Sequence, residues 1–328
     1  MSLPAFFQDV FSLQSKKDFE EKALKAFAYQ SEKCNIYKKY LELLGITAKS
    51  ITKTEHIPFL PIEFFKSSMV LCEEKTDIVF TSSGTTGSVE SKHFVADVSV
   101  YEKSFRTCFE LFYGPVSDYC IVALLPSYLQ KGGSSLVYMA DKLIKESNHR
   151  NSGFYKENFA ELKSVLHELQ NTNQKTLLLG VTYALLDFAE EYSMPLKNTI
   201  VMETGGMKGK RKELTREELH TQLKKAFAVE NIHSEYGMTE LLSQAYSKGD
   251  GVFSTPPWMN VVIRDVNDPL SILENNYSGG LNIIDLANIH SCSFIATQDL
   301  GKKLDDNTFE VLGRFDNSDI RGCNLLVE

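Results

Sequence analysis

Between about residue 76 and residue 245, short apolar runs alternate with segments whose apolar residues recur at helical spacing. The apolar runs cover 77–80, 119–125, 176–180 and 199–203, and the helical segments lie near 98–112, 133–145, 156–169 and 183–192. A strand that is buried on both faces reads as a continuous apolar run, and a helix between two strands makes them parallel neighbours. The alternation therefore predicts an α/β fold with a mainly parallel sheet covered by helices.

The chain on either side of this core has a different pattern. Phe19, Ala23 and Phe27 recur at helical spacing, and Gly45 supplies a stop, which predicts a helical lead-in. After residue 257, short strands separated by Asn, Asp and Gly turns predict a small antiparallel β subdomain. We therefore expect a helical N-terminal region, an α/β core, a small β subdomain and a short tail over 1–75, 76–250, 251–312 and 313–328.

Charge and composition exclude several classes of protein. The 35 basic and 43 acidic residues give a net charge of −8, which argues against a surface that captures nucleic acid. Neither a signal-type start nor an 18-residue apolar window occurs, so we expect a cytoplasmic protein without a membrane span. The six cysteines form no C-x-x-C and the histidines no zinc spacing, which predicts free thiols and gives metal catalysis no support. His220, on a predicted helix, is expected to be a solvated surface residue.

The strongest local signal is the segment Thr81–Ser88, which directly follows the apolar run 77–80. Six hydroxyl side chains and two glycines make a flexible loop whose N–H and O–H groups can converge on phosphate oxygens. A solvated linker would have the same composition, but the end of a buried strand is where α/β folds bind ligands. The spacing of neither a P-loop nor a dinucleotide-binding fingerprint is present. The loop is therefore a candidate nucleotide site of another kind.

Four further motifs lie near predicted strands. In Ser234–Glu240, the Tyr236 ring could stack on a base, and Gly237 could make room for it. The Thr239 hydroxyl could hold a phosphate, and the Glu240 carboxylate could bind Mg²⁺. Gly205-Gly206 follows the run 199–203, Thr297–Asp299 places a carboxylate at a strand end, and the segment 313–316 reads Gly-Arg-Phe-Asp. Each of these motifs alone is more often a turn.

Taken in order, TSSGTTGS, SEYGMTE, ATQD and GRFDNSDIRG resemble the successive motifs of the adenylate-forming superfamily, over residues 81–322. That superfamily includes acyl-CoA synthetases, luciferases and peptide-synthetase adenylation domains. FLPIEFFKSS, ETGGMKGKR and DIRGCNLLV, at 59–68, 203–211 and 319–327, more closely resemble the acyl-protein synthetase family. One member of that family is the fatty-acid-activating subunit of the bacterial luminescence fatty-acid reductase. The resemblance implies the N-terminal domain of an adenylate-forming enzyme, which uses ATP and Mg²⁺.

The resemblance also implies roles for individual residues. Tyr236 would stack on adenine, Thr239 would contact the phosphate and Glu240 would bind Mg²⁺. Asp299 and Arg314 would hold the ribose. The remaining positions would surround the phosphates (Thr81, Ser82, Ser83, Gly84, Thr85, Thr86, Gly87, with Lys92 closing the loop) or lie along the adenine (Gly205, Gly206).

Two features depart from the superfamily pattern. Ordinary members continue into a domain that supplies a catalytic lysine, and we expect that domain to be absent from this chain. In acyl-protein synthetases a cysteine near the chain end accepts the acyl group, and Cys323 matches it, although a lone cysteine can also simply pack against neighbouring leucines.

The resemblance therefore implies an AMP-forming acid–thiol ligase that activates a long-chain fatty acid, transfers it to Cys323 and delivers it to an acyl reductase or an acyl carrier. Two alternatives remain open. In the first, the chain is an acyl-CoA or aryl-CoA ligase, in which CoA replaces Cys323 as the acceptor. In the second, it is a non-catalytic subunit that binds a nucleotide or an acyl group. Replacing Cys323 with Ser separates the self-acylating enzyme from the CoA ligase, because only the self-acylating enzyme would lose turnover.

Overall fold

The computed structural model describes residues 4–82, 89–126, 133–205, 211 and 214–315. The predicted helical lead-in is confirmed by α1 (Lys16–Lys33) and α2 (Asn35–Leu43). Ser15 caps α1 by accepting a hydrogen bond from the Asp18 N–H, and α1 buries Phe19, Ala23 and Phe27. Past the end of α2, Gly45 has φ +69°, a conformation that glycine adopts at little cost.

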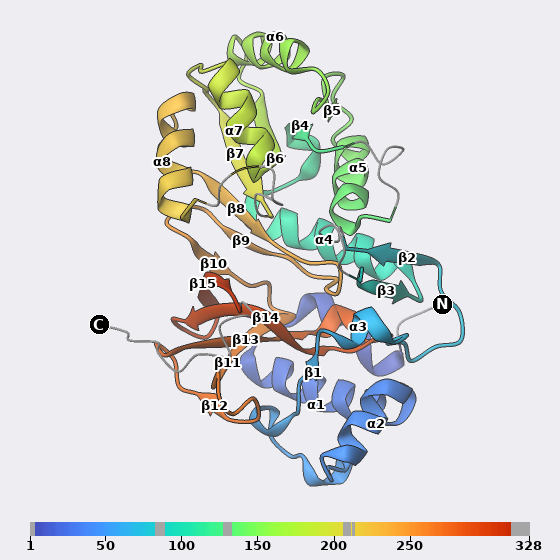
Figure 1. The fold of residues 1–328 in the computed structure, drawn as a ribbon. Helices are drawn as coiled ribbons and strands as arrows, with labels where there is room; N and C mark the ends of the chain where they lie inside the picture. Colours follow the sequence, from blue (N-terminus) through green and yellow to red (C-terminus); the bar gives the residue numbers. More distant parts are fainter. Residues whose placement is uncertain (1–3, 83–88, 127–132, 206–210, 212–213, 316–328) are drawn as a thin grey trace.

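The predicted parallel sheet is also present (Figure 1). Its strands run in the spatial order β8-β7-β6-β4-β5 and are all parallel to their neighbours: β4 (Tyr119–Leu124), β5 (Gly153–Phe154), β6 (Lys175–Val181), β7 (Thr199–Thr204) and β8 (His233–Tyr236). All six residues of β4 are buried, as its apolar run predicts.

Five helices connect or flank these strands. They are α4 (Val98–Tyr113), α5 (Ser135–Ser147), α6 (Phe159–Gln170), α7 (Thr182–Glu191) and α8 (Arg216–Phe227). The first turn of α8 forms a capping box, in which the Thr215 hydroxyl accepts from the Glu218 N–H and the Glu218 carboxylate accepts from the Thr215 N–H. The helices therefore begin and end close to where the periodicity predicts.

The strands after residue 257 pair with one another in antiparallel fashion, as expected, and the two strands between residues 245 and 254 are also antiparallel to their neighbours. They are β9 (Ala245–Ser247), β10 (Val252–Ser254), β11 (Met259–Arg264), β12 (Ile272–Leu273), β13 (Ser278–Asp285), β14 (Phe294–Lys303) and β15 (Thr308–Arg314). Because β10 pairs with both β9 and β15, these strands continue the ladder of the parallel strands instead of forming a separate sheet. The strand β1 (Leu60–Pro61) adds to β14, and the short helix α3 (Phe64–Ser67) follows it. The domain boundaries at 75, 250 and 312 stay predictions.

The expected place of the run 77–80 in the parallel sheet is wrong. In the described part of the chain, β2 (Ile78–Thr81) pairs only with β3 (Lys92–Val95), in a separate antiparallel ladder. Only Phe80 of β2 is fully buried, so the run is not covered on both faces as a central parallel strand is. The Ser/Thr/Gly segment therefore connects two antiparallel strands and does not follow a strand of the main sheet.

Within the described residues, no helix combines the length and the apolar character that crossing a lipid bilayer requires. The five described cysteines are free, as expected: Cys34, Cys72, Cys108, Cys120 and Cys292. Cys323 lies outside the described residues.

Candidate functional site

Three of the predicted site residues meet where the two kinds of strand adjoin. Tyr236 ends β8, Asp299 lies in β14, and Arg314 ends β15 opposite Asp299 in the antiparallel ladder. The Tyr236 hydroxyl donates to Asp299 Oδ2 over 2.8 Å, and Arg314 Nε lies 3.2 Å from Asp299 Oδ1. Burial raises the pKa of Asp299, while the Arg314 guanidinium acts in the opposite direction. The predicted base-stacking and ribose-binding residues thus form one hydrogen-bonded cluster.

The Tyr236 ring is held firmly by its neighbours. It packs edge-on against Phe253 and Phe309, with ring centroids 5.9 and 5.5 Å away. Burial raises the pKa of its hydroxyl well above the ordinary value, so the hydroxyl stays protonated and can donate to Asp299. A ring fixed in this way loses little entropy when a flat base stacks on it.

Glu240 lies buried in the turn after β8. Its backbone carbonyl accepts from the Asn288 side chain over 2.8 Å, and Ser91 hydrogen-bonds to its carboxylate. Burial raises the pKa of Glu240, and the carboxylate forms no ion pair with any described residue. The described residues contain no cluster of three or more side chains that could cage a metal. A single carboxylate suits Mg²⁺ that is bound chiefly through substrate phosphates.

The beginning of the Ser/Thr/Gly segment is anchored by backbone contacts. The Thr81 N–H donates to the Gly133 carbonyl over 2.7 Å, and the Ser82 N–H donates to the Ser91 carbonyl over 3.1 Å. The Ser91 N–H in turn donates to Ser82 Oγ over 2.9 Å. Ser91, which the sequence did not single out, therefore links Ser82 to Glu240.

Of the remaining residues that we predicted to surround the phosphates, the structure describes Lys92. Lys92 begins β3 as the ladder partner of Thr81, and its side chain is exposed. The others lie outside the described residues: Ser83, Gly84, Thr85, Thr86 and Gly87.

His93 hydrogen-bonds to Thr239 and so helps to fix its position. The sequence did not single out His93 either. A carbonyl can only accept, so His93 Nδ1, 2.8 Å from the Thr239 carbonyl oxygen, carries the proton and donates. Burial lowers the pKa of His93 to about 4, which keeps the ring neutral at pH 7. Residues 92–95 read Lys-His-Phe-Val and do not alternate between apolar and polar side chains, so no local signal marked His93; the structure places it on the buried face of β3.

Replacing His93 with Phe is expected to lower the free energy of unfolding by about 1–3 kcal/mol, because the Thr239 carbonyl loses its donor. Denaturant unfolding of the wild-type chain and the variant measures the change. The exposed His167 of α6 offers a matched control, H167F, which should unfold like the wild-type. Equal stability of all three chains would contradict the structural role of His93.

The predicted adenine loop begins at Gly205, directly after β7. Gly205 has φ +68°, and its carbonyl accepts from the Thr182 hydroxyl at the start of α7 over 2.6 Å. Gly206 lies outside the described residues. The expectation that His220 is solvated is wrong: its Nε2 lies buried, 3.7 Å from the equally buried Glu203 Oε1. Helix α8 turns His220 toward the end of β7, which periodicity alone did not distinguish from the solvent face.

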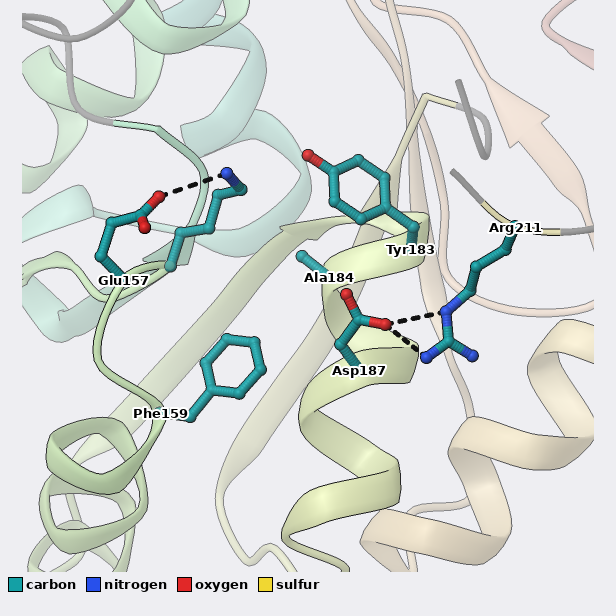
Figure 2. A pocket seen from close by; sticks show the side chains of 7 residues that line it. Glu157, Phe159, Tyr183, Ala184, Asp187 and Arg211 are labelled. Atoms are coloured by element: carbon teal, nitrogen blue, oxygen red, sulfur yellow. Dashed lines mark hydrogen bonds and ion pairs between the residues drawn. The ribbon is translucent and has the colours of Figure 1, made fainter. Parts of the chain in front are cut away.

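A pocket of about 350 Å³ lies beside the first half of α7 (Figure 2). Its lining combines two aromatic rings with charged side chains: Lys156, Glu157, Phe159, Tyr183, Ala184, Asp187 and Arg211. Arg211 donates to Asp187 and Glu190, so its guanidinium is ion-paired. None of the predicted site residues lines this pocket.

Comparison with known proteins decides the family. The family model described as acyl-protein synthetase, LuxE, matches residues 10–328. The chain belongs to this family. The expected resemblance is therefore confirmed over nearly the whole chain. No curated protein matches the sequence.

Solved structures share the fold at low sequence identity. An open conformation of 2-hydroxyisobutyryl-CoA ligase, in complex with 2-HIB-AMP and CoA, is 12% identical with a TM-score of 0.66, covering 96% of this chain and 76% of that one. ATP-bound MatB from Rhodopseudomonas palustris is 13% identical with a TM-score of 0.54, covering 74% of this chain. The chain spans about half, 49%, of the length of MatB. The fold is therefore that of the adenylate-forming enzymes, as the motifs led us to expect.

Proposed function

We propose that the chain uses ATP to activate a carboxylic acid as an acyl-adenylate and then passes the acyl group to a protein thiol. The observation that carries the proposal is the Tyr236–Asp299–Arg314 cluster beside the buried Glu240, in a chain of the acyl-protein synthetase family. The proposal further specifies a long-chain fatty acid as the substrate, Cys323 as the first acceptor of the acyl group, and an acyl reductase or an acyl carrier as its recipient. A cytoplasmic location stays a prediction.

In the first step, a carboxylate oxygen of the acid attacks the α-phosphorus of ATP, and pyrophosphate leaves with the electron pair of the broken P–O bond. Positioning and stabilisation of phosphate charge supply most of the catalysis in such a displacement. Mg²⁺, when bound at Glu240, supplies charge neutralisation to the phosphates. The hydroxyls of Thr81, Ser82 and Thr239 and the exposed Lys92 ammonium would contact phosphate oxygens. Ser83, Gly84, Thr85, Thr86 and Gly87 would complete that loop.

The nucleoside would lie between the ends of β7 and β8. Gly205 and Gly206 would run along one side of the adenine, and the Tyr236 ring would stack on it. Asp299 would accept from ribose hydroxyls while Arg314 balances its charge. In the second step, a thiolate attacks the acyl carbon and AMP leaves, which gives a thioester. Cys323 is the proposed nucleophile.

The test is incubation of the protein with Mg-ATP and radiolabelled acids of different chain length. We expect acid-dependent exchange of pyrophosphate into ATP, and protein-bound label that neutral hydroxylamine removes. C323S should lose the label completely and keep the exchange, whereas the control C72S should keep both.

The other outcomes separate the alternatives. Exchange without protein label, together with consumption of CoA when CoA is added to the mixture, would identify a CoA ligase. Absence of exchange with every acid would contradict the adenylation step and favour a binding subunit.

A further inference from the structure

Asp285, the last residue of β13, is fully buried and accepts hydrogen bonds from two separate segments of the chain. Its Oδ2 accepts from the backbone N–H groups of Leu242 and Ser243, over 2.8 and 3.0 Å. Its Oδ1 accepts from the Ser243 hydroxyl over 2.5 Å and from the Ala287 N–H over 3.0 Å. One carboxylate therefore ties the chain after β8 to the short 3-10 helix η6 (Leu286–Asn288).

The helix η6 also contacts Glu240 directly. The Asn288 side chain donates from Nδ2 to the Glu240 carbonyl over 2.8 Å. Asn288 is fully buried, and its Oδ1 has no hydrogen-bond partner in the part of the chain that the structure describes. On the other side, the Gln30 side chain of α1 donates to the carbonyls of Asn288 and Ile289, over 2.9 and 3.0 Å. Glu240 is therefore hydrogen-bonded to a turn that Asp285 and α1 both hold in place.

These bonds fix the backbone from which the Glu240 side chain extends. Burying the Asp285 carboxylate costs free energy, which the N–H and O–H donors around it offset. The Glu240 carboxylate is itself buried and hydrogen-bonded by Ser91. A carboxylate binds a metal ion most tightly when its backbone and side chain already have the bound geometry.

We propose that Asp285 and Asn288 are positioning residues that hold the Glu240 carboxylate where it meets the Mg²⁺ of Mg-ATP. Asn288 acts on Glu240 itself, and Asp285 acts both on the residues that follow Glu240 and on the helix that carries Asn288. This inference rests on the proposed function, because Mg²⁺ at Glu240 is part of it. Removing the partners that orient a metal ligand typically costs about 10- to 100-fold in metal affinity.

The experiment is calorimetric titration of the full chain with ATP, once in excess Mg²⁺ and once with EDTA in place of the metal. The ratio of the two dissociation constants gives the gain in ATP affinity that Mg²⁺ supplies. We expect D285N and N288L to reduce this gain by about 10-fold and to keep the wild-type affinity without metal. In D285N, an amide N–H group replaces an oxygen that accepts hydrogen bonds, and in N288L the side chain can no longer donate to Glu240.

Asp305 offers a matched control. Its Oδ1 accepts from the N–H groups of Asn307 and Thr308, in the exposed turn between β14 and β15. D305N makes the same chemical change away from Glu240 and should keep the full gain from Mg²⁺. A purely structural role of Asp285 would lower the free energy of unfolding of D285N, or its affinity for ATP with and without metal alike, but not the gain.

A wild-type gain from Mg²⁺ in both D285N and N288L, together with a lost gain in E240Q, would overturn this inference and leave the proposed function standing. If D285N does not fold, a wild-type gain in N288L would overturn it alone. Failure of the wild-type protein to bind ATP more tightly with Mg²⁺ would overturn both this inference and the proposed metal role of Glu240.

Discussion

Replacing Glu240 with Gln is expected to slow acid-dependent pyrophosphate exchange by about 100-fold or more. The Glu240 carboxylate is buried, accepts from Ser91 and has no ion-pair partner among the described residues. A charge kept in that state costs free energy unless a cation compensates it, and Mg-ATP would bring one. Gln keeps the size and can still accept from Ser91, so the variant changes mainly the charge.

The rate of exchange at increasing Mg²⁺ concentration measures this effect. E240Q should need more Mg²⁺ for half-maximal rate, and its maximal rate should stay low. E217Q, on the exposed first turn of α8, is the matched control and should behave like the wild-type protein. An E240Q protein with a normal rate at ordinary Mg²⁺ would contradict the proposed metal role of Glu240.

Replacing Asp299 with Asn is expected to raise the KM for ATP by about 10- to 100-fold, which corresponds to the 1.5–3 kcal/mol of a hydrogen bond to a charged group. The carboxylate of Asp299 accepts from Tyr236 and pairs with Arg314, so it is fixed toward the proposed ribose site. Asn retains the shape but loses the charge that strengthens these bonds.

ATP analogues separate ribose recognition from support of Tyr236. The wild-type protein should bind ATP more tightly than 2′-deoxy- and 3′-deoxy-ATP, and D299N should lose that preference. R314A should have a smaller effect, because 68% of the Arg314 side chain is exposed and solvent already screens its pair with Asp299. D306N, at an exposed turn, is the control. Unchanged discrimination in D299N would contradict contact with the ribose.

Much of the fold could be predicted because its signals are local. Continuous apolar runs indicated β4, β6 and β7, and helical periodicity with a capping box indicated α8. Two local signals were misleading. The run 77–80 is apolar but pairs with β3 outside the main sheet, because its partner was not recognised as a strand. His220 lies on the buried face of α8, and one polar residue does not indicate which face of a helix it occupies.

The sequence by itself determined the alternation of strands and helices, the chemistry of the motifs and, through their order, the family, because these depend on residues close together in the chain. Only the tertiary structure decided which side chains meet. Tyr236 and Asp299 are 63 residues apart and touch because β8 and the antiparallel strands belong to one sheet. His93 reaches Thr239 from a strand 146 residues earlier. Burial, which shifts the pKa values of His93 and Asp299, also depends on packing by distant segments, and no local pattern records it.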